Sequence, residues 1–223
     1  MDATRRTLLA AGALAAVGVR PAAIAQAPAR TFVAGQHYGV LNPSLPVDAP
    51  AGKIEVLEFF WYGCIHCYNL EPAVHAWLKA LAPDVAFRYV PAVFNDRWAH
   101  DARIFYAFEA LGAGPKVHRP LFDAIHKEKL DTAKQEAFNA FLGKAGIDAR
   151  KFDEAFRSFG VQSKMRRAAQ MTQAYRVDGT PSLAVHGVYT VSADQGGTAQ
   201  GMFAIVDHLV DIVRKSKGTA PQA

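Results

Sequence analysis

The sequence Phe59-Phe60-Trp61-Tyr62-Gly63-Cys64-Ile65-His66-Cys67-Tyr68 predicts a strand that delivers two thiols to the start of a helix. An apolar run ends in glycine, a Cys-x-x-Cys pair follows at once, and residues with helical spacing come after it. The free N–H groups and the positive dipole end of a helix favour a thiolate over a thiol. We therefore expect Cys64 to be the exposed, reactive thiol and Cys67 to be shielded one turn further on.

The flanking residues predict a strand, a helix and a second strand. Residues 53–60 are apolar on both faces, as in a central strand that is covered on each side. Residues 64–81 follow with helical spacing, and Pro72 is expected to kink this helix. Residues 85–90 form a second buried strand, for which a parallel crossover is the default. A short strand within residues 36–41 precedes this unit.

The pattern is helical from residue 95 to residue 176. Phenylalanines recur there at helical spacing, which is more typical of a core than of a ligand pocket. Thr132 and Gln135 form a capping-box pattern, and Asp148 is placed to cap the following helix. The chain then returns to strands at residues 182–185 and 188–191, which predict a hairpin. A polar loop at residues 192–200 and a last helix at residues 202–215 complete the order.

Residues 1–25 have the pattern of a secretory signal peptide. Two arginines precede a short apolar segment, and small residues at positions 23–25 offer a cleavage site before Gln26. The apolar segment is shorter than the ~20 residues of a membrane-spanning helix, and Arg20 interrupts it. The pattern predicts export, and the two arginines suit both the ordinary secretory route and the twin-arginine route.

Charge and cysteine content argue against a nucleic-acid-binding protein and in favour of a redox protein. The net charge of +5 falls to +3 once residues 1–25 are removed, and no basic stretch interleaved with aromatic residues supports a nucleic-acid partner. The chain has only two cysteines. Small exported domains are commonly stabilised by several disulfides. A disulfide between Cys64 and Cys67 would close a very short loop and would remove little entropy from the unfolded chain. The pair therefore indicates redox chemistry rather than a structural disulfide.

Three stretches together resemble the DsbA family of exported thiol-disulfide oxidoreductases. They are Val56-Leu57-Glu58-Phe59-Phe60, Cys64-Ile65-His66-Cys67-Tyr68 and Val177-Asp178-Gly179-Thr180-Pro181-Ser182-Leu183. The resemblance spans essentially the whole mature chain and implies an α/β, thioredoxin-like fold with an inserted all-helical domain. The expected organisation is a signal peptide at 1–25, a thioredoxin-like domain in two parts at 26–94 and 177–223, and a helical insertion at 95–176.

Two positions depart from the family pattern. The dipeptide between the cysteines is Ile65-His66 where the family's best-known sequence is Pro-His, and Thr180 stands before the later proline where valine is frequent. Both positions tune redox potential and substrate release in this fold. The oxidising strength of this protein therefore does not follow from the resemblance.

Candidate catalytic residues are Cys64, Cys67, His66, Glu58 and Pro181. A protonated His66 would stabilise the Cys64 thiolate, and the alternative is an exposed side chain without effect. Glu58 shares a strand face with apolar residues and resembles the family's buried acid that exchanges a proton with Cys67; the alternative is an ion-paired or edge-exposed glutamate. The resemblance places Pro181, expected in the cis form, against the cysteines.

Candidate substrate-binding residues surround the thiols. Thr180 would offer backbone groups to an extended substrate, in the manner of an added strand, and Ile65 lies between the two cysteines. Aromatic side chains around the pair are candidates for an apolar rim, with the core as the alternative for each; they are Trp61, Tyr62 and Tyr68.

The sequence thus predicts a monomeric periplasmic oxidase that introduces disulfides into reduced exported proteins, with no cofactor beyond the Cys64–Cys67 disulfide and no metal. The resemblance implies re-oxidation by a membrane quinone-linked oxidase of the DsbB type. One alternative is a reductase or isomerase of the same fold. Another is a non-catalytic metal-binding periplasmic protein, although the remaining histidines have no ligand-like spacing. Haem attachment would need histidine in the place of Tyr68.

Overall fold

The computed structural model describes residues 31–218. The predicted signal peptide at residues 1–25 lies outside the described residues, and all that follows concerns the compact unit that begins at Phe32. Its elements follow the chain in the order β1 (Gly39–Val40), β2 (Ile54–Phe60), α1 (Ile65–Lys79), β3 (Val85–Pro91), α2 (Asp96–Ala110), α3 (Gly114–His126), α4 (Gln135–Lys144), α5 (Ala149–Arg157), α6 (Phe159–Ala174), β4 (Ser182–Val185), β5 (Tyr189–Ser192), α7 (Ala193–Gly196) and α8 (Ala199–Gly218).

The strands of the described chain form one mixed sheet in the order β1-β5-β4-β2-β3. β2 lies inside this sheet, parallel to β3 and antiparallel to β4. All seven residues of β2 are buried, which confirms the prediction of a central strand that is covered on both faces. Because α1 connects β2 to β3, the predicted parallel crossover is confirmed as well, and so is the hairpin of β4 and β5.

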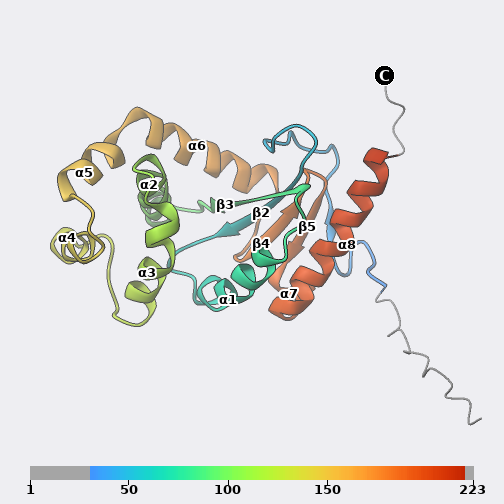
Figure 1. The fold of residues 1–223 in the computed structure, drawn as a ribbon, viewed down its shortest axis with the longest axis horizontal. Helices are drawn as coiled ribbons and strands as arrows, with labels where there is room; N and C mark the ends of the chain where they lie inside the picture. Colours follow the sequence, from blue (N-terminus) through green and yellow to red (C-terminus); the bar gives the residue numbers. More distant parts are fainter. Residues whose placement is uncertain (1–30, 219–223) are drawn as a thin grey trace, which may run out of the picture. The chain divides into compact units, whose positions relative to one another are not determined.

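Helices cover both faces of the sheet (Figure 1). On one face Ile54 and Val56 pack with Leu70 of α1 and Val206 of α8. Phe59 points the other way, and its ring centroid lies 5.1 Å from that of Tyr175, which follows α6. Alternation along β2 therefore sends neighbouring side chains into opposite layers. None of the described helices is both long and apolar enough to cross a membrane.

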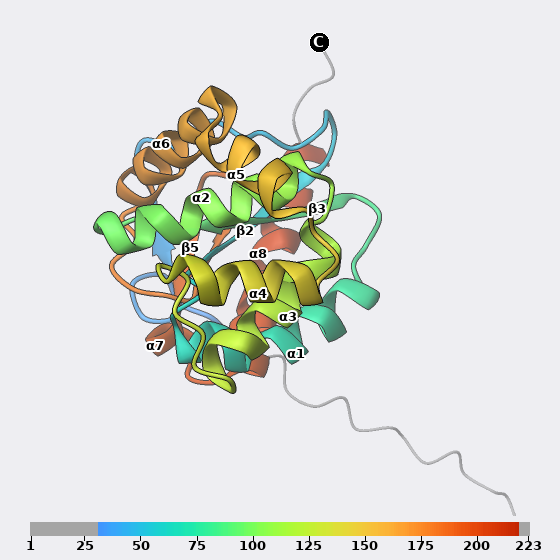
Figure 2. The ribbon, with the colours of Figure 1, turned by 90° about the vertical axis from the view of Figure 1, so that its left-hand side faces the viewer.

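The helices α2 to α6 lie between β3 and β4 in the sequence and form the helical part of the fold (Figure 2). Phe108, Phe138 and Phe152 are buried there, with ring centroids 4.9 to 6.4 Å apart. The prediction that these phenylalanines form a core is confirmed, and so is the helical insertion into the α/β fold. The domain boundaries at residues 95 and 176 stay a prediction.

Two local predictions are wrong. Thr132 does not cap α4: that helix begins after Lys134, and the Thr132 hydroxyl instead donates to Oδ1 of buried Asp101 at 2.6 Å. A buried carboxylate without donors is costly, so this bond outweighs a helix cap. The predicted polar loop at residues 192–200 contains α7, which starts with a reciprocal capping box between Ser192 and Gln195. Asp148 caps α5 as predicted.

Pro72 lies inside α1, the helix that carries the cysteine pair. Proline has no backbone N–H, so it cannot bond to the carbonyl four residues earlier, that of Tyr68. Arg119 of α3 donates its Nη1 to this carbonyl at 3.5 Å. A side chain of the helical insertion thus meets a carbonyl that the helix itself leaves unpaired.

Gly187, in the turn between β4 and β5, provides a test of the fold. Its φ is +68°, and a Cβ there would lie 2.2 Å from the carbonyl oxygen of Leu45. We expect Gly187→Ala to lower the free energy of unfolding by about 3 kcal/mol. Alanine would be strained in the left-handed backbone conformation, and its Cβ would clash with the Leu45 carbonyl. The control is Gly52→Ala, because Gly52 has a φ of +83° but open space around it. This substitution should lower the free energy of unfolding by about 1 kcal/mol. Urea denaturation measures both, and equal losses would contradict the predicted clash.

Candidate active site

The chain between β2 and α1 places Cys64 at the helix start. Cys64 occupies the position before the first helical residue, with φ −84° and ψ 117°, and its N–H donates to the carbonyl of Trp61 at 3.0 Å. The Trp61 indole lies over Gly63 so closely that a Cβ at Gly63 would be 2.4 Å from the ring. The glycine before the pair is therefore required by the indole that packs on it.

The two thiols differ in exposure and in acidity. Cys64 is partly exposed and Cys67 is fully buried, and both are free thiols. A hydrogen bond from the Cys67 side chain is the main cause that lowers the pKa of Cys64 to about 5; burial opposes it, and hydrogen bonds from Thr180 and from backbone N–H groups at the helix start add to it. Burial raises the pKa of Cys67 well above its usual value, and the hydrogen bond to Cys64 raises it further.

Thr180 contacts Cys64 although 116 positions separate the two residues. The Cys64 thiol donates to the Thr180 carbonyl oxygen at 3.3 Å. β4 begins directly after Pro181, and its pairing with β2 sets this approach. The Thr180–Pro181 peptide bond is cis, as expected. Pro181 and His66 also line a small groove of about 160 Å³ beside Met202 of α8.

Glu58 lies on β2 beneath the thiols, in register with Tyr89 of β3 and Leu183 of β4. It is fully buried, and neither carboxyl oxygen has a hydrogen-bond partner. Burial raises the pKa of Glu58 well above its usual value, and the charges of Glu71 and Cys64 raise it further. Burial in this setting favours the protonated form of the carboxyl over its carboxylate.

His66 is exposed on the first turn of α1. Its backbone N–H is one of the hydrogen bonds that lower the pKa of the Cys64 thiol. The tuning role of its imidazole stays a prediction.

The aromatic side chains around the pair have different surroundings. Trp61 stacks on Trp98 of α2, with ring centroids 4.3 Å apart, and its Nε1 donates to Asp101 Oδ2 at 2.8 Å. Tyr68 is partly buried; its hydroxyl donates to Asp123 at 2.9 Å. Ile65 is 47% exposed.

The inclusion of Tyr62 in an exposed rim is wrong. Its side chain is 2% exposed, its hydroxyl lies 2.9 Å from Nδ1 of His118, and its carbonyl lies 2.8 Å from Nε2 of His126. Both histidines belong to α3. Tyr62 is thus a core residue that ties the loop before Cys64 to the helical insertion.

Sequence reasoning missed Trp98, Phe94 and Asp101. Phe94 is 45% exposed, and its ring meets Trp98 edge to face at 4.7 Å, so an aromatic surface runs from Trp61 across α2. Trp98 and Asp101 lie three residues apart, which puts them on one face of a helix. That spacing was a usable signal, but its connection to Trp61 was not visible in the sequence.

Thiol–disulfide exchange requires one sulfur that is readily ionised and a neighbour that is protected until it is released. Thioredoxin-fold oxidoreductases build this pair at a helix start facing a cis-proline, and this structure belongs to that class. Residues 55–209 match the family model of the DSBA-like thioredoxin domain, and the chain belongs to this family.

Relatives and solved structures agree with this assignment. The thiol:disulfide interchange protein DsbA of Burkholderia cepacia is 38% identical over 88% of this chain and 92% of its own length. That of Azotobacter vinelandii is 38% identical over 94% and 96%. The crystal structure of Pseudomonas aeruginosa DsbA has a TM-score of 0.80 at 36% identity, covering 84% of this chain and 97% of its own. Among the described residues, no group of three or more His, Cys, Asp or Glu side chains is arranged to hold a metal.

The hydrogen bond between the two thiols leads to a direct test of the Cys64 pKa. We expect Cys67→Ala to raise this pKa from about 5 by about one to two units, because the thiolate loses its main donor. Cys67→Ser keeps a donor and should raise it less. The ultraviolet absorbance of the thiolate and the alkylation rate, both followed against pH, measure the change. An unchanged value in Cys67→Ala would show that Thr180 and the helix start set the pKa without the Cys67 thiol.

Proposed function

We propose that this protein introduces disulfide bonds into exported proteins through its Cys64–Cys67 disulfide. The observation that carries the proposal is the difference in pKa between the two thiols: that of Cys64 is lowered to about 5, and that of Cys67 is raised. A substrate thiolate attacks Cys64, and Cys67 leaves and takes up a proton. A second substrate thiolate then attacks the substrate sulfur and releases Cys64 as a thiolate. The substrate loses two electrons, and the enzyme gains them.

The direction of transfer follows from the Cys64 thiolate. Its pKa is lower in the folded reduced protein than in an unfolded chain, so the thiolate stabilises the folded reduced form fully above the ordinary thiol range near pH 8.5. This contribution decreases as the pH falls toward the folded value of about 5 and is lost below it. The disulfide form has no such thiolate. At neutral pH the reduced enzyme is therefore favoured, which makes the disulfide form an oxidant.

The neighbouring residues take the predicted roles in this reaction. Glu58, buried without a partner, gives a proton to Cys67 when that sulfur leaves and takes it back on re-oxidation. Thr180 and Pro181 hold the substrate backbone beside Cys64, and the Cys64–Thr180 contact of 3.3 Å supports this role. His66, exposed next to the pair, adds positive charge when it is protonated.

Substrate polypeptides bind over the apolar surface beside Cys64. Ile65, Trp61, Trp98 and Phe94 form this surface, with Tyr68 at its α3 side. Unfolded chains present apolar side chains without a fixed sequence, which suits such a surface. The protein acts as a monomer in the periplasm after removal of residues 1–25, and a DsbB-type membrane quinone-linked oxidase restores its disulfide. Nucleic acid and metal have no part in this proposal.

Oxidative refolding of a reduced multi-cysteine protein tests the direction of transfer. The oxidised protein should restore the substrate's native disulfides in stoichiometric amount, and Cys64→Ala should abolish this activity because no mixed disulfide forms. Equilibration with glutathione then gives the redox potential. A potential as low as that of thioredoxin, about −270 mV, would instead establish a reductase of the same fold.

Trp98 tests the substrate surface. Trp98→Ala should raise KM for an unfolded substrate about fivefold and leave the redox potential unchanged, because the ring partners of Trp98 are Trp61 and Phe94. Phe159→Ala is the matched control: this ring is 81% exposed on α6 and its removal should leave KM unchanged. Equal KM values for the two variants would place substrate binding elsewhere.

A further inference from the structure

The indole of Trp61 has one polar atom, and the partner of this atom lies on the helical insertion. Trp61 Nε1 donates to Oδ2 of Asp101 on α2 at 2.8 Å. An indole nitrogen can only donate a hydrogen bond, and a carboxylate oxygen is a strong acceptor for it. Rotation of the ring would break this bond, so Asp101 holds the indole in one orientation.

Asp101 is itself fixed by further donors. Its side chain is 2% exposed. The Thr132 hydroxyl donates to Oδ1 at 2.6 Å, and Arg97 Nε lies 3.4 Å from Oδ2. Both carboxylate oxygens thus have donors, from α2 itself and from the loop between α3 and α4. A buried carboxylate with this set of donors has little freedom to move, because leaving any of them unpaired is costly.

The Trp61 ring lies on the loop that leads to the thiols. It stacks on Trp98 with ring centroids 4.3 Å apart, and a Cβ at Gly63 would lie 2.4 Å from it. The ring and the Gly63 backbone are therefore packed against each other without room for another atom. A change in the position of the ring changes the space left for the residue directly before Cys64.

The backbone of Trp61 contacts both cysteines. Its carbonyl accepts from the Cys64 N–H at 3.0 Å, at the residue that caps α1. A hydrogen bond from the Trp61 backbone also lowers the pKa of Cys67, against the larger effect of burial. The helical insertion thus holds the side chain of Trp61, while the main chain of the same residue is bonded to both halves of the thiol pair.

We propose that Asp101 is a positioning residue for the redox reaction: it holds Trp61, and the backbone of Trp61 keeps Cys64 at the helix start where its thiolate is stabilised. The inference rests on the proposed function and adds the helical insertion to the groups that set the oxidising strength of the protein. The exchange reaction is unchanged, because the substrate sulfurs lose two electrons and the Cys64–Cys67 disulfide gains them. Asp101 acts on this reaction through Trp61.

Charge and position predict opposite effects of removing the Asp101 carboxylate. A negative charge near the pair disfavours a thiolate, so loss of the charge alone would stabilise the reduced enzyme. Loss of the hydrogen bond would free the Trp61 ring and the loop beneath it. The N–H groups of the helix start would then be less well placed around the Cys64 sulfur, which destabilises the thiolate and the reduced enzyme. The sign of the change in the redox equilibrium separates the two roles.

The redox equilibrium of Asp101 variants with glutathione tests the proposal. We expect Asp101→Ala to lower the equilibrium constant for reduction of the enzyme about fivefold or more. The pKa of Cys64, followed by thiolate absorbance, should rise in parallel. Asp101→Asn removes the charge but keeps an oxygen for the indole, and its constant should stay within about twofold of the wild type. A loss of stability that is equal in the oxidised and reduced forms leaves the constant unchanged, so a merely structural role does not move it.

Trp61→Phe removes the indole N–H and keeps an aromatic ring at the same position. It should lower the equilibrium constant as Asp101→Ala does. Adding Asp101→Ala to this variant should produce no further fall, because both substitutions break the same hydrogen bond. If Asp101→Ala does not fold, Trp61→Phe provides the test by itself.

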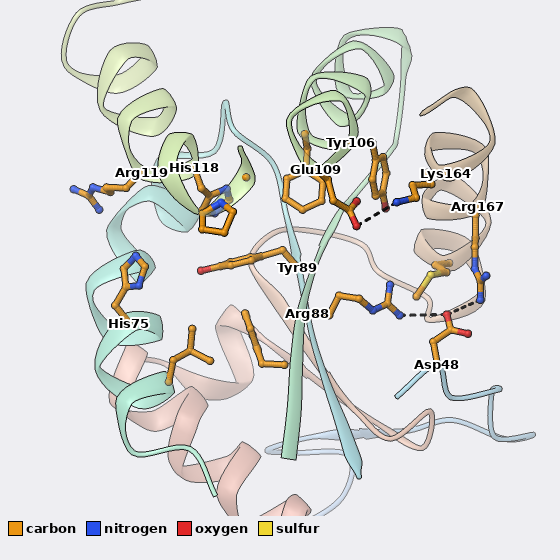
Figure 3. A pocket seen from close by; sticks show the side chains of 16 residues that line it. Asp48, His75, Arg88, Tyr89, Tyr106, Glu109, His118, Arg119, Lys164 and Arg167 are labelled. Carbon is orange, nitrogen blue, oxygen red and sulfur yellow. Dashed lines mark hydrogen bonds and ion pairs between the residues drawn. The ribbon is translucent and has the colours of Figure 1, made fainter. Parts of the chain in front are cut away.

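The matched control is Glu109→Gln on the same helix. Glu109 lies in a cavity of about 550 Å³ beside β3 and pairs there with Lys164 at 3.2 Å (Figure 3). Its substitution removes one carboxylate from α2 and leaves the bond between Asp101 and Trp61 in place. The equilibrium constant should equal that of the wild type.

An unchanged or raised equilibrium constant in Asp101→Ala would overturn the proposal, and so would a wild-type constant in Trp61→Phe. An equal fall in Asp101→Asn and Asp101→Ala would contradict it too, as would additive losses in the double variant. A wild-type protein that oxidises no thiol substrate refutes the proposed function instead. Because the glutathione equilibrium compares the variants without a protein substrate, the two failures are distinct.

Discussion

The antiparallel pairing of β2 with β4 is the constraint on which the active site depends. β2 ends where the cysteine loop begins, and β4 begins directly after Pro181, so the register of Phe59 with Ser182 brings the Thr180 carbonyl within 3.3 Å of the Cys64 sulfur. The same pairing keeps Glu58 inside the sheet between Leu183 and Tyr89. The helical insertion can occupy the chain between β3 and β4 because the sheet alone fixes the positions of the strands on either side of it.

The insertion nevertheless contributes to the site by holding the loop that leads into it. Asp101 of α2 binds the Trp61 indole, while His118 and His126 of α3 contact the hydroxyl and the carbonyl of Tyr62. Each of these polar contacts is buried or half-buried, so a group left without its partner there would lower the stability of the fold. The residues before Cys64 are thus fixed from the helical side, and the residue facing Cys64 is fixed from the sheet side. The sulfur lies where the two sets of contacts meet.

Local features of the site could be predicted from the sequence, and contacts between distant segments could not. The apolar run before Gly63 and the helical spacing after Cys67 determine a strand and a helix start, because both depend on neighbouring residues. The burial of Tyr62 depends instead on two histidines of α3, more than 50 positions away. The capping prediction for Thr132 is wrong for the same reason, since its partner Asp101 belongs to another helix. Likewise, buried Glu71 of α1 accepts a hydrogen bond from Tyr89 of β3 and lies 3.5 Å from His118 of α3, and no spacing within α1 indicates these contacts.

The proline in α1 has a consequence for how the two parts of the fold move. A helix with an unbroken hydrogen-bond ladder behaves as a stiff rod, but Pro72 leaves the Tyr68 carbonyl without its intrahelical donor, and Arg119 of α3 supplies one at 3.5 Å. The Arg119 guanidinium also lies over the Tyr68 ring, 4.4 Å from its centroid. The first turn of α1 therefore contacts α3 through Arg119 at the point where its own helix lacks one hydrogen bond. When a large client protein docks on the insertion and displaces α3, the Arg119 contacts would move the first turn of α1 and with it the sulfur of Cys64.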